Sequence, residues 1–297
     1  MLDTFNLPGQ EQVIKTFYAN STNWQTWEKP NSAKFVSIVC IGAGGSGSGG
    51  VAGSNTTARA GGSGGGSAGY SIGFFSAAAL PDRLYVQVPN GGAGVTGTTG
   101  NAGGLAYVTV QPNTTAINIL MQSGAAAPNG GGNQTGGAAG TAWAGSILSN
   151  LGFVSVFAGQ IGAAGTASNA TPNNVTPAGM TTGGAAGGGC SSNAQVSGGT
   201  IVGTGFLNSV NGGPSFTGAT GGDGSSYMST IPSNNSSTRL PMIFLGGSGG
   251  GSSASFGGGK GGNASYGCGG GGSGAAFTGL QNISGNGGDG LVIITAW

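Results

Sequence analysis

The chain has 297 residues, of which 71 are glycine, and only 7 Lys and Arg and 6 Asp and Glu carry its charge, for a net charge of +1. Ordinary globular proteins contain about 7% glycine and about 25% charged residues, so the composition argues against a helical protein, a basic nucleic-acid-binding protein and a typical metabolic enzyme. Histidine is absent, which leaves acid–base chemistry to six carboxylates and three cysteines.

The charged residues are unevenly distributed. Six of them lie in the first 34 residues, and none lies between Arg83 and Asp223. We therefore expect two parts, an N-terminal lead-in or attachment segment of residues 1–34 and a glycine-rich β domain of residues 35–297. Disordered chains combine low hydrophobicity with high net charge, whereas this chain is 37% hydrophobic, so we expect the long neutral body to be ordered.

Short apolar runs of strand length recur along the chain and predict β-strands. The first and the last are apolar on both faces, which is typical of buried central strands, and we expect these two to pair with each other. Others, such as residues 84–88, alternate with period two, as strands with one buried face do. The runs are residues 35–41, 70–75, 84–88, 106–110, 117–121, 153–157, 242–245 and 291–294.

Glycine tracts fill the intervals between these runs. Their spacing is irregular and the chain has only 11 prolines, which excludes a collagen triple helix. Without Cβ atoms, extended threads resembling polyproline II can approach closely enough to hydrogen-bond to one another. The predicted fold is all-β, a β-sandwich-like body with glycine-rich threads and long loops. The main tracts are residues 42–66, 91–104, 124–140, 183–189, 246–274 and 285–290.

Two glycine motifs suggest nucleotide binding, but both lack the required context. Residues 42–47 match G-x-G-x-x-G after a predicted strand, yet no amphipathic helix follows, and the next acidic residue along the chain is Asp82. Residues 256–261 resemble part of a phosphate-binding loop, yet Gly261 occupies the position where a Ser or Thr would meet Mg²⁺. We therefore expect no cofactor.

The carboxylates and cysteines offer little chemistry. Asp223 and Asp289 both lie in Gly-Gly-Asp-Gly, where an Asp side chain is expected to cap its own turn, although a pair of carboxylates is also what glycan hydrolysis requires. Cys40, Cys190 and Cys268 are widely spaced and form no CxxC, so we expect small buried side chains and no disulfide or metal site. No catalytic residue is predicted.

Two groups of residues are candidates for contacts with other molecules. Aromatic side chains among the glycines could stack on a receptor or could fill gaps between threads. The N-terminal segment could form a lead-in strand or an anchor. The receptor candidates are Trp143, Tyr227, Phe256, Tyr266 and Phe277, and the attachment candidates are Trp24, Trp27, Lys29 and Lys34.

Four stretches of the chain share a distinctive pattern, namely the lead-in Trp27-Glu28-Lys29-Pro30, residues 36–47 (VSIVCIGAGGSG), residues 84–94 and the closing residues 287–297 (GGDGLVIITAW). With this pattern, the two ends of the chain resemble the glycine-rich domain proteins of tailed-bacteriophage virions, whereas the middle matches mainly in composition. The resemblance implies a tail fibre or minor structural protein of the virion. It also implies layered glycine threads with loops presented to the host surface, as in the glycine-rich adhesins of T-even-like phages.

We therefore expect a non-enzymatic virion structural protein, a tail fibre or fibre-tip component in host attachment. Its expected partners are other virion proteins, a host surface glycan or protein and further copies of itself, since burial in a homo-oligomer such as a trimer would stabilise a glycine-rich chain. The alternatives are a head fibre or capsid decoration protein, a glycan depolymerase and a secreted wall protein. The N-terminus does not resemble a signal peptide and no run of about 18 apolar residues occurs, so we expect synthesis in the host cytoplasm, assembly into the virion and no membrane insertion.

Overall fold

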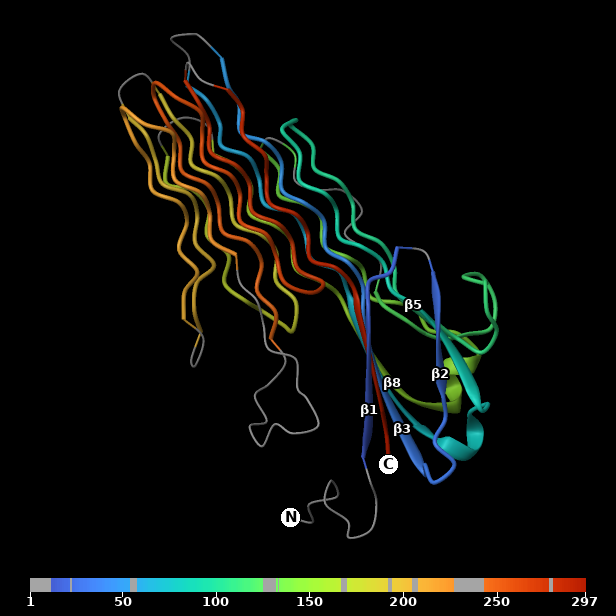
Figure 1. The fold of residues 1–297 in the computed structure, drawn as a ribbon. Helices are drawn as coiled ribbons and strands as arrows, with labels where there is room; N and C mark the ends of the chain where they lie inside the picture. The colour runs from blue at the N-terminus through green and yellow to red at the C-terminus, as the bar shows by residue number, and fades with distance from the viewer. Residues whose placement is uncertain are drawn as a thin grey trace.

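The apolar runs form two antiparallel sheets that pack face to face, and the glycine tracts form a bundle that extends from one end of this sandwich (Figure 1). The computed structural model describes residues 12–21, 23–53, 58–124, 132, 134–166, 170–191, 194–204, 208–226, 243–277 and 280–297. The all-β prediction is confirmed, since the helical structure within these residues consists of two short 3₁₀ turns, η1 (Ala77–Ala79) and η2 (Leu148–Leu151).

The larger sheet has five strands in the order β1-β9-β3-β4-β8. Its strands are β1 (Val13–Tyr18), β3 (Phe35–Ile41), β4 (Tyr70–Ser76), β8 (Gly152–Phe157) and β9 (Leu291–Ala296). The predicted pairing of the first and last apolar runs is confirmed, because β3 lies between β9 and β4 and pairs with β9 from Val36 opposite Ala296 to Ile41 opposite Leu291.

The smaller sheet has four strands in the order β2-β5-β6-β7. Its strands are β2 (Trp24–Glu28), β5 (Arg83–Gln87), β6 (Tyr107–Thr109) and β7 (Ile119–Gln122). The period-two pattern of residues 84–88 places Leu84, Val86 and Val88 in the core with no exposed surface. The register of β6 against β7 shifts between Val108 and Thr109.

The core lies between the two sheets and includes residues of the N-terminal segment. Phe17 of β1 and Trp27 of β2 are almost fully buried in the same cluster as Ile38, Phe75 and Leu84. Strands β1 and β2 thus belong to the sandwich, and in the described chain residue 34 does not separate two structural units. A functional boundary at residue 34 stays a prediction. Deleting residues 1–34 would remove one strand from each sheet.

One strand prediction is wrong. Residues 243–245 form an extended thread and not a strand, while Met242 lies outside the described residues. Phe244 and Leu245 are nevertheless buried. Phe244 packs with Ile41, Tyr70 and Cys268, so this apolar run contributes side chains to a small core at the base of the bundle.

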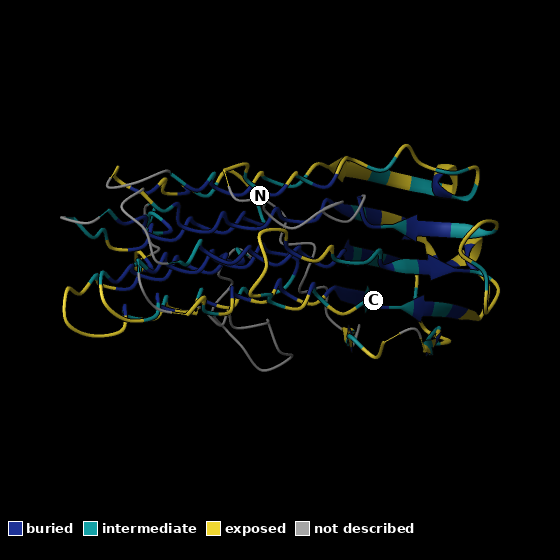
Figure 2. Ribbon diagram, turned by 90° about the horizontal axis from the view of Figure 1, so that it is seen from above, coloured by how far each residue is buried: buried dark blue, intermediate teal, exposed yellow. Residues whose placement is uncertain are grey.

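The glycine-rich threads leave the sandwich at a single end. Strands β3 and β4 are joined by an excursion of residues 42–69, β5 and β6 by residues 88–106, β7 and β8 by a path through residues 123–151, and β8 and β9 by residues 158–290. By contrast, short connections join β2 to β3, β4 to β5 and β6 to β7 at the other end. Figure 2 shows buried backbone along the interior of the bundle and exposed residues on its outside and at its end loops.

The hydrogen bonds of residues 268–276, which we call the central thread, repeat every third residue. Polyproline II has three residues per turn, so successive N–H groups point about 120° apart and reach different neighbours. The N–H groups of residues 269, 272 and 275 donate to the carbonyls of residues 182, 185 and 188 in one neighbouring thread. Those of residues 270, 273 and 276 donate to residues 45, 48 and 51 in a second thread. Those of residues 271 and 274 donate to residues 262 and 259 in a third thread.

The carbonyl groups of the central thread accept from three further threads. Gly65 and Gly62 donate to Gly270 and Ser273, Gly247 and Gly250 donate to Gly269 and Gly272, and Gly285 and Gly288 donate to Gly271 and Cys268. The central thread therefore has six hydrogen-bonded neighbours. This arrangement satisfies the buried peptide groups outside any regular sheet.

Close packing of the threads requires glycine where a neighbouring carbonyl lies against the Cα. A Cβ added to Gly272 would lie 2.0 Å from the carbonyl oxygen of Gly62, and one added to Gly269 would lie 1.9 Å from that of Gly65. The interior also accepts serine, whose hydroxyl joins the network. For example, the Ser273 hydroxyl accepts from the Gly50 N–H at 2.8 Å, and the Ser48 hydroxyl accepts from the Ser63 N–H at 2.9 Å.

Replacing an interior glycine by alanine is expected to destabilise the protein far more than replacing an exposed one. In Gly272→Ala the new methyl group must displace backbone, and we expect the free energy of unfolding to fall by about 1–3 kcal/mol or more. Denaturant-induced unfolding followed by circular dichroism measures the change.

The matched control is Gly97→Ala, because a Cβ at Gly97 meets nothing within 4 Å and its φ lies outside the left-handed region. Alanine there is expected to leave stability unchanged or to raise it by up to about 1 kcal/mol. Equal effects of the two substitutions would contradict the close-packed bundle.

Candidate functional site

The end of the bundle farthest from the sandwich carries a group of apolar side chains that we call the apolar tip, formed by Phe216, Phe256, Phe277 and Leu280. Phe216 is 43% exposed, Phe256 49% and Leu280 83%, while Phe277 is half-buried. Threads that run outward from the sandwich end here, at the loops that precede the return threads. Exposed aromatic rings are suited to contact with another molecule.

Ser253, which is fully buried, holds the backbone of the apolar tip together. Its hydroxyl donates to the carbonyl of Ala219 at 2.7 Å and accepts from the N–H of Phe256 at 3.0 Å. Its carbonyl accepts from the N–H of Phe277 at 3.1 Å, and the carbonyl of Ser252 accepts from the N–H of Phe216 at 3.1 Å. The backbone of the three phenylalanines is thus fixed around two adjacent residues, Ser252 and Ser253.

The structure brings together two of the five aromatic residues proposed as receptor contacts, Phe256 and Phe277. It adds Phe216, which the sequence analysis did not single out. A sequence signal exists, because each of the three phenylalanines follows Ser or Ala and is followed two residues later by glycine, at residues 215–218, 255–258 and 276–279. Tyr227 lies outside the described residues.

Trp143 and Tyr266 lie elsewhere and pack against the protein. Trp143 is partly buried against the sandwich core. Tyr266 is partly buried at the base of the bundle, where its ring meets Phe244 edge-on at 5.9 Å and lies 6.1 Å from Tyr18. Burial raises the pKa of Tyr266, and the nearby Tyr18 and Asp289 raise it further. These contacts agree with the gap-filling alternative for both residues.

The two carboxylates considered for glycan hydrolysis each bind the backbone of another thread. Asp223 Oδ1 accepts from the N–H of Lys260 at 2.8 Å, and Asp289 Oδ1 accepts from the N–H of Gly91 at 2.8 Å. We expected each Asp to cap its own turn, but in the structure each carboxylate instead links two threads. The two carboxylates serve different parts of the bundle.

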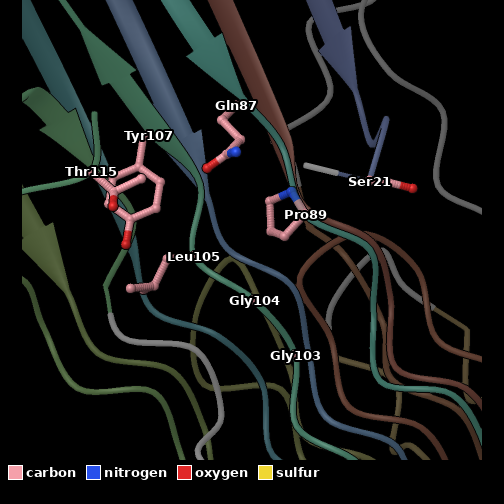
Figure 3. A pocket seen from close by; sticks show the side chains of 8 residues that line it. All are labelled: Ser21, Gln87, Pro89, Gly103, Gly104, Leu105, Tyr107 and Thr115. Atoms are coloured by element: carbon pink, nitrogen blue, oxygen red, sulfur yellow. The ribbon is translucent and has the colours of Figure 1, made fainter. Parts of the chain in front are cut away.

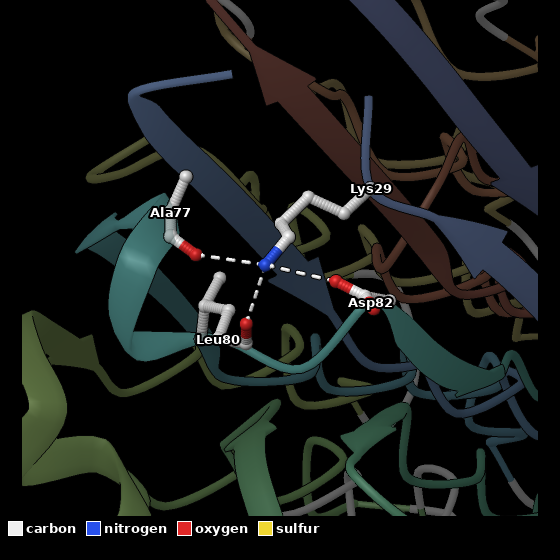
Figure 4. Close-up of polar contacts among 4 residues, drawn as sticks. All are labelled: Lys29, Ala77, Leu80 and Asp82. Carbon is white, nitrogen blue, oxygen red and sulfur yellow. Dashed lines mark hydrogen bonds and ion pairs between the residues drawn. The ribbon is translucent and has the colours of Figure 1, made fainter. Parts of the chain in front are cut away.

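The four N-terminal candidates have different environments. Trp27 is buried in the core, Trp24 is half-buried and Lys34 is exposed. The Lys29 ammonium group donates to the carbonyls of Ala77 at 3.0 Å and Leu80 at 2.7 Å and lies 3.3 Å from Asp82 Oδ1 (Figure 4). Lys29 therefore fixes the η1 turn, and Lys34 remains the candidate whose side chain is free to reach a partner.

A hollow of about 510 Å³ lies where the smaller sheet meets the bundle (Figure 3). Gln87, Leu105, Tyr107 and Thr115 are among the residues that line it. Burial raises the pKa of Tyr107, with a smaller contribution from Cys40. The lining carries hydroxyl and amide groups but no carboxylate, so it offers no acid–base pair for hydrolysis.

The cysteine thiols are buried, and the possible metal-ligating side chains in the described residues are not grouped. Burial raises the pKa of all three thiols, to about 11 at Cys190 and about 12 at Cys268, and all three are free cysteines. In the described part of the chain, no three His, Cys, Asp or Glu side chains are grouped as metal ligands would be. Nor does any helix there have the length and apolar character needed to cross a membrane.

No model of a known protein family matches this chain, and no curated protein is significantly similar to it in sequence.

The buried thiols are expected to resist alkylation in the native protein. A thiol reacts as its thiolate, and a pKa of about 11 at Cys190 leaves on the order of one thiolate in a thousand at pH 8. Reaction with a chromogenic disulfide at pH 8 should therefore be slow in buffer and should reach three thiols per chain in denaturant. Rapid native modification of even one thiol would show that the fold leaves it accessible.

Proposed function

We propose that this chain is a non-enzymatic structural protein of a tailed-phage virion, a tail fibre or fibre-tip component whose apolar tip contacts the host surface. The observation that carries the proposal is the position of the apolar tip. It lies at the far end of the thread bundle, while Val13, where β1 begins, and Ala296, where β9 ends, face each other at the opposite end of the sandwich. One end is therefore available for attachment and the other for contact.

The chemistry of the apolar tip supports a neutral ligand. Phe216 and Phe256 present about half of their surface, and aromatic rings bind sugars and protein side chains at low entropic cost because few torsions are immobilised. The hydrogen bonds around Ser253 hold the backbone of these rings in place before contact, which lowers the cost of ordering on binding.

Two further observations favour a structural role over catalysis. The Asp223 and Asp289 carboxylates already accept backbone hydrogen bonds that join threads. The hollow in Figure 3 is lined by neutral groups. A glycan depolymerase would need two carboxylates about 5–10 Å apart across a sugar, and these residues are engaged in different parts of the bundle.

The location of the chain in purified particles tests the proposal directly. A small tag joined to Trp297 and imaged by electron microscopy is expected to mark the tail, near its distal end. A tag on the capsid shell would assign the chain to the head fibres or decoration proteins. Particles that contain no tagged chain would overturn the virion assignment.

The contact role predicts a specific effect of tip substitutions. Phe216→Ser with Phe256→Ser removes two exposed rings, and we expect adsorption to host cells to slow at least tenfold, since buried aromatic anchors at an interface often contribute more than about 1.4 kcal/mol each. Adsorption is followed by counting unbound particles over time.

Ile147→Ser is the matched control. Ile147 is 88% exposed and precedes η2 beside the sandwich, so its loss should leave both adsorption and stability unchanged. Normal adsorption of the double tip variant, with unchanged thermal unfolding, would contradict the contact role. The location of the chain in the particle is tested separately by the tag on Trp297.

A further inference from the structure

The edge strands of the two sheets differ in how they are protected from pairing with another chain. On one side of the sandwich, β1 carries Lys15, whose ammonium group donates to the carbonyl of Thr26 in β2 at 3.0 Å, and Gln25 of β2 donates to the carbonyl of Tyr18 at 2.9 Å. These bonds tie the two edges together. β2 also ends in a charged residue, Glu28, and charges on an edge discourage pairing.

On the other side, the β7 edge is short and partly covered. It has four residues, its ladder with β6 shifts register, and the Ser146 hydroxyl donates to the carbonyl of Ile119 at 2.5 Å. β8 lacks the short length and the register shift, and within the described residues the loop beside it lines a hollow on its core side without a backbone hydrogen bond to its edge. It has six residues without charge or proline and pairs with β4 in a regular register, so within the described sheets it is the edge most open to another strand.

The outer face of β8 is also apolar. Phe153 is 85% exposed and Phe157 40%. Phe153 lies opposite Phe74 in the ladder, and the Phe74 ring stacks on Phe35 at 5.4 Å. A long apolar edge that continues into an apolar sheet face is a strong site for addition of a strand.

The sequence of β8 identifies the strand that fits. Residues 153–157 read Phe-Val-Ser-Val-Phe, the same in both directions, and antiparallel pairing reverses direction. We propose that β8 pairs with β8 of a second copy of this chain about a two-fold axis through Ser155. Each Phe153 then lies opposite a Phe157, each Val154 opposite a Val156, and Ser155 opposite its own copy.

This register keeps each face continuous. Odd-numbered residues of β8 point to the outer face of the sheet and even-numbered ones to the core side, where Val154 packs against the sandwich core. A two-fold axis perpendicular to the sheet joins outer face to outer face, so odd residues must meet odd residues, as they do about Ser155. The two five-stranded sheets then form one sheet of ten strands, and the interface is isologous.

The molecule leaves space beside this edge. A hollow of about 320 Å³ lies next to β8 and is lined by Trp143, Gly145 and Ser149 as well as Val154 and Val156. Valines of the partner strand can enter it from the core side. Because the paired strands are antiparallel, the two thread bundles extend in opposite directions, and in a dimer attached through one protomer the apolar tip of that protomer points outward.

Opposite charges at the two-fold axis test the pairing. Like charges directly opposite each other destabilise a ladder, whereas unlike charges stabilise it. We expect the wild-type chain to sediment as a dimer, and Ser155→Lys or Ser155→Asp alone to weaken self-association about fivefold or more. An equimolar mixture of the two variants should restore dimers that contain one of each. Thr115→Lys, at an exposed position outside β8, controls for added charge.

A cysteine at the axis gives a second measurement. Ser155→Cys should form a covalent dimer with a short bifunctional thiol-reactive crosslinker, because directly opposed Cβ atoms lie about 4.5–5.5 Å apart and the native cysteines are buried. Thr115→Cys should not. A monomeric wild-type chain, undiminished association in both charge variants, or failure of Ser155→Cys to crosslink would each overturn the pairing.

Discussion

Hydrogen bonding of the peptide groups in the glycine threads is the constraint on which this molecule depends. A polyproline II thread makes no internal hydrogen bonds, so a buried one must find partners for every N–H and carbonyl outside itself. The N–H groups of residues 269–276 and the carbonyls of residues 268–273 do so with six neighbouring threads. Three residues per turn direct successive groups to successive neighbours, and the missing Cβ atoms allow the approach. The large number of glycines is thus a packing requirement.

The β-sandwich determines the order in which the glycine threads lie side by side. Glycine threads have few side chains to distinguish one neighbour from another, so their order must be set elsewhere. Strands β3, β4, β5, β6, β8 and β9 lead directly into threads or receive them, and their ladders fix which threads start side by side. The core around Trp27, Ile38 and Leu84 fixes the sandwich, and the serine hydroxyls within the bundle, such as Ser48 and Ser273, add specific bonds between threads.

Local patterns predicted most of the strands and one of their pairings. Residues 35–41 matched β3 because an apolar run bounded by glycine has few alternatives, and the pairing of β3 with β9 followed from their shared two-sided burial. The N-terminal segment was expected only as a lead-in, and the place of β1 beside β9 was not predicted, since residues 13–18 mix Lys15 with apolar residues. Residues 243–245 were mistaken for a strand because an apolar run also suits a thread that covers a sheet face.

The candidate site was predicted only in part, for a related reason. Phe256 and Phe277 were identified as aromatic residues among glycines, but their proximity to Phe216 depends on the register of threads far apart in sequence, through Ser253. That register is set by backbone hydrogen bonds, which leave little trace in side-chain patterns. The links from Asp223 and Asp289 to neighbouring threads were missed in the same way.

Because the threads are held together by backbone packing, the residues that stabilise the bundle differ from those that form its surface. Interior positions such as Gly272 are held to glycine by a carbonyl 2.0 Å from any added Cβ, so substitution there acts on stability. Loop positions such as Gly97 and Gly218 have open space around them, so substitution there leaves the thread lattice intact. A bundle of this kind can therefore change the side chains at its far end without changing the structure that holds them.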